Sequence, residues 1–138
     1  MKLWLALSFL FVATPAWAAD CPLDLGHGTG TVIYSDQYMI ALRPDPIRIE
    51  VGEPFALIMN VCTKAGEPAE LVHVDVTMPE HKHGMNYAPT IQAQGDGRYR
   101  VEGLLFHMPG SWEVAFDVRP AGKPGGETQR LAHDFVLK

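Results

Sequence analysis

The sequence is short of basic residues and of cysteine. Its 138 residues include 11 Lys and Arg against 16 Asp and Glu, which gives a formal net charge of −5. With so little positive charge, neither a nucleic acid nor an anionic membrane surface is expected as a partner. Catalytic motifs are also missing, because no serine stands beside a His/Asp pair in a recognisable pattern and no glycine-rich loop opens a helix. We therefore do not expect an enzyme.

Long apolar runs are missing except at the N-terminus. There Lys2 precedes an apolar run over residues 3–12, and residues 16–18 form a small-x-small cleavage site. This pattern predicts a secretory signal peptide over residues 1–19, followed by a single domain over residues 20–138. The apolar run is too short for a permanent membrane anchor. We expect a soluble protein, exported to a bacterial periplasm and not membrane-spanning once processed.

The two cysteines, Cys21 and Cys62, form no C-x-x-C pair. In an oxidising compartment two such residues usually form a disulfide, which is the interpretation that we favour. It would tie the mature N-terminus to the domain. The alternative is a thiolate metal site, although both cysteines lie far in sequence from the histidine-rich stretch described below.

Long amphipathic helices are missing too. Instead, 13 glycines and 11 prolines punctuate short runs in which apolar residues alternate. Short strands at such spacing predict an all-β fold, an antiparallel β-sandwich of about seven strands. The segments that carry the strand pattern are residues 31–34, 38–43, 47–51, 55–62, 71–78, 90–94, 98–106, 111–118 and 130–137.

Details of the alternation predict which side chains face the core. The nearly continuous apolar run of residues 55–62 predicts a central strand. In residues 71–78, one face carries Val72, Val74, Val76 and Met78. Later the pattern slips at Gly103, which suggests a β-bulge there.

The most informative stretch that is present is Met-Pro-Glu-His-Lys-His-Gly-Met, residues 78–85. If the chain stays extended here, His81, His83 and Met85 point to the same side. Imidazole and thioether groups together suit a soft or borderline metal, above all copper. Met85, in a polar loop, is expected to be exposed and to be a ligand, whereas Met78 continues an apolar face and is expected in the core.

A second loop is predicted at the same end of the sandwich. If residues 71–78 run up, residues 90–94 run down and residues 98–106 run up again. His107 and Met108 then emerge beside the first loop. Because neighbouring strand residues point to opposite sides, we expect only one of the two to reach the site directly, with His107 ahead.

Other histidines and aromatic residues fit structural roles. His73 lies on the outward face of its strand and should be solvated, while His133 should be partly buried. His27 falls in a glycine-rich N-terminal segment. Trp112 and Phe116 lie on the apolar face of a strand and are expected in the core.

The histidine-rich loop, Gly97-Arg98-Tyr99 and the segment from Met108 to Val114 together resemble the YtkA-like/FixH-like family of small exported domains. The shared pattern reads GRY followed by F-x-MPG-x-W-x-V, and the likeness covers residues 47–118. The resemblance implies an immunoglobulin-like β-sandwich and an association with copper handling and cytochrome oxidase assembly. Many relatives are membrane-anchored, and this chain departs from that.

The sequence therefore predicts a soluble periplasmic copper chaperone or buffer. Its metal ligands would be His81, His83 and Met85, completed by His107 or Met108, with Cu(I) favoured and zinc a weaker candidate. The expected partner is an envelope protein that receives copper. The alternative is a metal-free module that binds another envelope protein. A zinc or copper enzyme with Glu80 as a base is a third, disfavoured reading.

Overall fold

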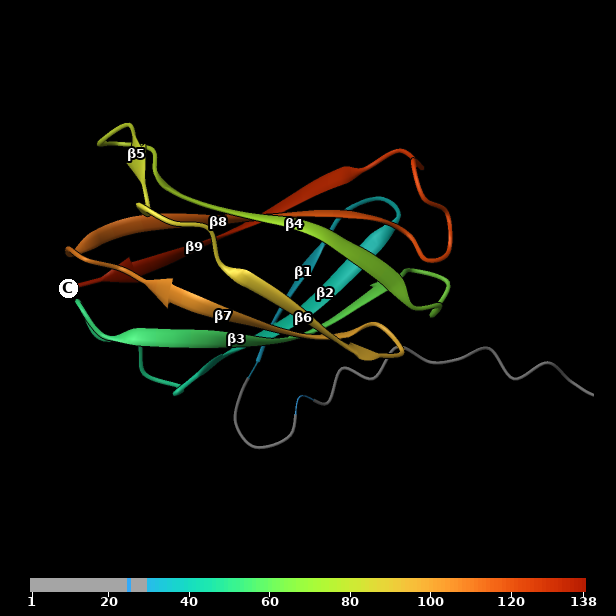
Figure 1. Ribbon diagram of the computed structural model, residues 1–138, viewed down its shortest axis with the longest axis horizontal. Coiled ribbons are helices and arrows are strands. Elements are labelled where there is room, and N and C mark those ends of the chain that lie inside the picture. Colours follow the sequence, from blue (N-terminus) through green and yellow to red (C-terminus); the bar gives the residue numbers. More distant parts are fainter. Residues whose placement is uncertain (1–24, 26–29) are drawn as a thin grey trace, which may run out of the picture.

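The computed structural model describes residue 25 and residues 30–138, and its regular elements there are all strands (Figure 1). They form two antiparallel sheets that pack as a sandwich, so the predicted all-β fold is confirmed. The described part holds nine strands against the seven or so expected. One sheet has the order β1-β2-β3-β7-β6 and the other β5-β4-β8-β9. The strands are β1 (Thr31–Tyr34), β2 (Tyr38–Asp45), β3 (Pro54–Thr63), β4 (Ala69–Met78), β5 (His83–Gly84), β6 (Thr90–Gly95), β7 (Arg98–Leu105), β8 (Gly110–Pro120) and β9 (Gln129–Leu137).

The core lies between the two sheets and is filled by the inward faces predicted from alternation. β3 lies in the middle of its sheet, between β2 and β7, as its continuous apolar run predicted. Trp112 and Phe116 on β8 are fully buried, as expected. Burying a large apolar side chain stabilises the fold by about 1.5–3 kcal/mol, so these inward faces determine how the sheets pack.

The predicted bulge at Gly103 is present. Phe55 pairs with Leu104 but Leu57 pairs with Val101, so two β7 residues lie opposite Ala56. Gly103 has a φ of +79°, a conformation that glycine adopts without steric cost. Beyond the bulge Leu104 and Phe106 point into the core, and both are fully buried. The bulge therefore sets the direction in which the chain enters the following loop.

Two expectations about strands are wrong. Residues 47–51 form no strand and instead connect β2 to β3, which pair directly with each other. In β4, Val72 is 38% exposed while Leu71 is buried, so Val72 does not share the inward face of Val74 and Val76. A register shift in the pairing with β8, between Leu71 and His73, reverses the alternation at this point.

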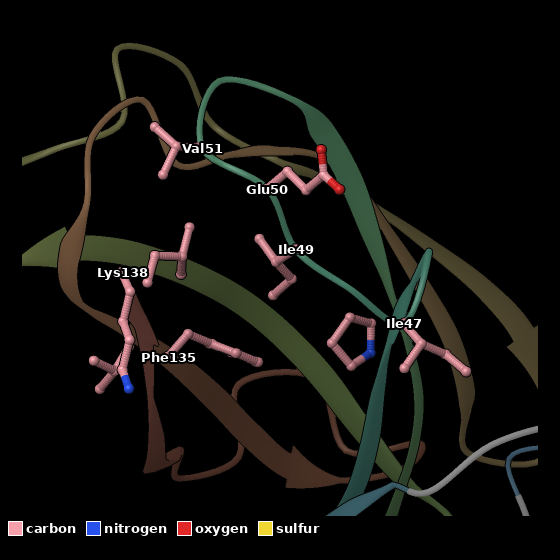
Figure 2. A pocket seen from close by; sticks show the side chains of 9 residues that line it. Ile47, Ile49, Glu50, Val51, Phe135 and Lys138 are labelled. Atoms are coloured by element: carbon pink, nitrogen blue, oxygen red, sulfur yellow. The ribbon is translucent and has the colours of Figure 1, made fainter.

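Residues 47 and 49–51 instead line a groove of about 560 Å³ together with the end of β9 (Figure 2). Ile49 and Phe135 pack against the core from this segment and from β9. Ile47 and Val136 are 56% and 71% exposed at its edges. The groove gathers apolar side chains but holds neither a histidine nor a methionine.

The end of the sandwich that matters for function is the one where β4 and β7 finish. Thr77 pairs with Glu113, so the start of β8 lies beside the end of β4. Figure 1 shows β5 and the connection between β7 and β8 at this same end, near the C-terminus. The reversals predicted from the sequence are therefore correct. Among the described residues, no helix is long and apolar enough to cross a membrane.

Candidate metal site

The first histidine-bearing loop is a tight hairpin rather than an extended segment. The backbone turns between Pro79 and Lys82, where the His81 N–H donates to the Met78 carbonyl at 3.1 Å. Lys82 has a φ of +54°, in the left-handed region that non-glycine residues rarely adopt. The chain then returns as β5, whose His83 pairs with Met78. The extended conformation expected from the sequence is therefore wrong for His81, which lies in the turn.

Pairing with β4 sets the direction of His83. Directly paired residues of antiparallel strands project to the same face, and the Met78 side chain is buried in the core. His83 therefore faces inward over the end of the sandwich, where it is half-buried. Gly84 permits this close pairing, because a Cβ atom there would lie 2.5 Å from the Val76 carbonyl oxygen.

The second loop joins β7 to β8, and aromatic packing in the core fixes its position. Phe106 and Trp112 are fully buried and stack with ring centroids 4.9 Å apart and planes 13° apart. The Trp112 Nε1–H donates a hydrogen bond of 3.0 Å to the Met108 carbonyl. This bond and the stack hold the turn above the core, with His107 exposed on it.

Three imidazoles meet at this end, and we call His81, His83 and His107 the histidine cluster. The ring centroids of His83 and His107 are 5.3 Å apart, and those of His81 and His83 are 5.7 Å apart. Trp112 lies beside two of them, with its ring centroid 5.1 Å from that of His107 and 6.0 Å from that of His83. The two loops thus converge as predicted, although 24 residues separate His83 from His107.

The methionines are placed differently from the histidines. Met85, expected to be exposed, is half-buried and packs against the core, and its Sδ accepts the Leu105 N–H at 3.4 Å. Its thioether therefore has a structural partner, which the sequence-based expectation missed. Met108 is also half-buried against the core. Met78 is 1% exposed and belongs to the core, as predicted.

Spacing within the cluster suits a shared ion. With a metal–nitrogen distance of about 2.0 Å, two imidazoles bound at roughly 110–125° have ring centres about 5.2–5.7 Å apart. The His83–His107 and His81–His83 distances fall in this range. His83 Nδ1 lies 3.4 Å from the Gly84 carbonyl oxygen. In the tautomer protonated at Nδ1, this contact leaves the Nε2 lone pair for a metal, a common arrangement for ligating histidines.

Spacing alone does not make a complete site. Across residue 25 and residues 30–138, no three His, Cys, Asp or Glu side chains are arranged to hold one ion as they stand. His81 and His107 are both exposed, so a change of rotamer would move them through solvent rather than through packed core. The donors that this end offers a soft metal are therefore a pair of imidazoles, with the third imidazole brought in by rotation.

The remaining predicted residues have the following positions. His73 is exposed on β4, as expected. His133 on β9 is half-buried and packs edge-to-face on Phe135, and burial lowers the pKa of His133 below its ordinary value. Cys62 is buried. The signal peptide, Cys21 and His27 lie outside the described residues, so the Cys21–Cys62 disulfide stays a prediction.

Trp112 is the residue whose position at the site the sequence analysis missed. Its place on the apolar face of a strand predicted the core, and it is a core residue. The same indole also contacts the histidine cluster, because β8 begins directly after the second loop. The signal that could have found this is spacing, since Trp112 lies only four residues after Met108 and five after His107.

The fold and this end of it define a small β-sandwich that presents imidazole groups from two loops. A model of the YtkA-like family matches residues 34–117, which is more than half of the chain. The protein belongs to the YtkA-like family, so the predicted resemblance is confirmed. Searches among curated proteins and among solved structures found no match to the chain.

Proposed function

We propose that this protein binds copper, as Cu(I), in the bacterial periplasm and acts there as a copper chaperone or buffer. One observation carries the proposal: His83 and His107, from loops far apart in sequence, lie with their rings 5.3 Å apart at one end of the sandwich. Neutral imidazoles are the commonest metal donors in proteins, and this pair lies at the spacing that a shared ion requires.

The chemistry of the donors favours copper over hard cations. Imidazole suits copper and zinc, and the thioethers of Met85 and Met108, which lie in or beside the same two loops, select for Cu(I). Structural zinc sites usually take four ligands from Cys, His, Asp or Glu. Within the described part of the chain, the donors at this end of the sandwich are imidazoles and thioethers, without a cysteine or carboxylate set of the kind that structural zinc prefers.

Exposure of the cluster suits a protein that passes its metal on. His81 and His107 face solvent, while His83 is half-buried. A receiving envelope protein could therefore approach the outer ligands and replace them one at a time. The predicted signal peptide over residues 1–19 would bring the chain to the compartment where such a partner resides.

An anaerobic titration of Cu(I) against a chromogenic competitor tests the proposal. The wild-type protein should bind one equivalent, and a His83→Ala/His107→Ala variant should lose most of its affinity. A His73→Ala variant is the matched control, because His73 is exposed on the outer face of β4 and should leave binding unchanged. Equal binding by the wild type and the double variant would show that the site is wrong.

The same titration separates the alternative function. If the wild type binds no Cu(I), a metal-free module that binds an envelope protein becomes the better interpretation. The observation that favours it is the groove beside β9, where Ile47 and Val136 are largely exposed (Figure 2).

A further inference from the structure

Trp112 contacts both halves of the proposed site. Its indole centroid lies 5.1 Å from that of His107 and 6.0 Å from that of His83, in edge-to-face geometry with both rings. Its Nε1–H also donates a hydrogen bond of 3.0 Å to the Met108 carbonyl oxygen. The side chain is fully buried and backed by Phe106. One aromatic residue therefore forms the inner wall of the histidine cluster and anchors the second loop.

This wall lacks any donor for a metal. The indole nitrogen carries a proton and cannot coordinate, and its proton is already donated to Met108. An ion held between His83 and His107 would meet an aromatic ring on its core side instead of a ligand or a water molecule. Zn²⁺ almost always completes a tetrahedron of four ligands, whereas Cu(I) accepts fewer and softer ones.

We propose that Trp112 is a specificity-determining residue of this site, and that it favours Cu(I) over Zn²⁺ by denying the ion a ligand on its core side. This inference rests on the proposed copper-binding function. It assigns part of the discrimination between the two metals to a residue that is not a ligand.

The variant Trp112→Phe tests the assignment. Phenylalanine keeps an apolar ring in the core but removes the Nε1–H and part of the wall, which leaves room for water beside an ion. The dissociation constant for Zn²⁺ should decrease, because a water molecule can then act as a ligand beside the ion. The ratio of the Zn²⁺ to the Cu(I) dissociation constant should therefore fall by about tenfold or more. A purely structural role would weaken both metals alike and leave this ratio unchanged.

Phe116→Leu is the matched control, because Phe116 is a fully buried aromatic residue further along the same face of β8. It should lower the stability of the fold without altering the ratio. A ratio in Trp112→Phe within about twofold of the wild-type value, or a change of equal size in Phe116→Leu, would overturn the proposal.

Fluorescence of the wild type gives a second test that needs no Trp112 variant. Of the three tryptophans, Trp4 and Trp17 lie in the predicted signal peptide, so Trp112 is the single tryptophan of the processed chain. One equivalent of Cu(I) should change its emission, and the His83→Ala/His107→Ala variant should show no change. Unchanged emission in a wild type saturated with Cu(I) would overturn the assignment while leaving copper binding intact. A wild type that binds no Cu(I) would instead refute the proposed function.

Discussion

The imidazole rings of His83 and His107 lie 5.3 Å apart, although the two residues are 24 positions apart in sequence. His83 belongs to β5, at the edge of one sheet, and His107 follows β7 of the other sheet. The contact therefore joins the two layers of the sandwich at its end. Its geometry depends on the packing of both sheets, so the spacing of the two imidazoles is a property of the whole fold.

The three histidines should differ in their contribution to Cu(I) affinity. His83 lies between the other two rings, so His83→Ala should weaken binding most, by at least about tenfold. His107→Ala should follow, and His81→Ala should have the smallest effect because His81 lies in the turn and contacts only His83 within the cluster. Competitive titration of the three single variants checks the order. A largest loss in His81→Ala would contradict the arrangement.

Met85 should contribute to stability whether or not it binds metal. Its Sδ accepts the Leu105 N–H, so Met85→Leu leaves that N–H without an acceptor and should lower the free energy of unfolding by about 1 kcal/mol. Urea denaturation measures the change. Met108→Leu is the control, since it replaces a thioether that is also half-buried against the core. It should change stability less, and equal losses in both variants would argue against a role for the sulfur hydrogen bond.

Gly84 should be required for the β4–β5 hairpin. In Gly84→Ala the new Cβ would lie 2.5 Å from the Val76 carbonyl oxygen, which is backbone and cannot move aside easily. We expect a loss of about 1–3 kcal/mol in stability and weaker Cu(I) binding, because His83 would shift with its strand. Denaturation and titration of the same variant measure both effects. Thr77→Ala, at the paired position on β4, should leave Cu(I) affinity unchanged.

His133 should make stability depend on pH. Burial lowers the pKa of His133 in the folded protein below its ordinary value of 6.5. Between these two values the unfolded chain binds more protons than the folded protein. The contribution of neutral His133 to the free energy of unfolding is therefore complete above pH 6.5 and is lost as the pH falls through the lowered pKa. The free energy of unfolding, measured by urea denaturation from pH 5 to 8, should show this slope. His133→Leu should flatten it, and an unaltered slope would contradict the prediction.

Much of the fold was predictable because strand alternation reports burial directly. The inward positions of Val74 and Val76, the central place of β3 and the bulge at Gly103 all follow from apolar pattern and glycine. The meeting of the two loops was also predictable, because the β6–β7 hairpin returns the chain to the end of the sandwich at which β6 begins. These features depend on local pattern and on the number of chain reversals.

Other features depend on contacts that no local pattern encodes. The register shift that exposes Val72 arises from pairing with β8, and β5 is too short to leave an alternating pattern. The turn at Lys82 requires a backbone conformation that lysine seldom adopts. Met85 finds its hydrogen-bond donor on β7, twenty positions away. For Val72 and Met85 the deciding neighbour is distant in sequence, so the local pattern could not reveal it.

The hairpin gives the three histidines unequal freedom. His83 is tied into backbone pairing with Met78, while His81 and His107 sit on exposed turns. If Cu(I) binds here, one donor would stay anchored while the other two swing outward. An acceptor protein could then take hold of the ion before the last bond breaks, so that the copper is never released into water.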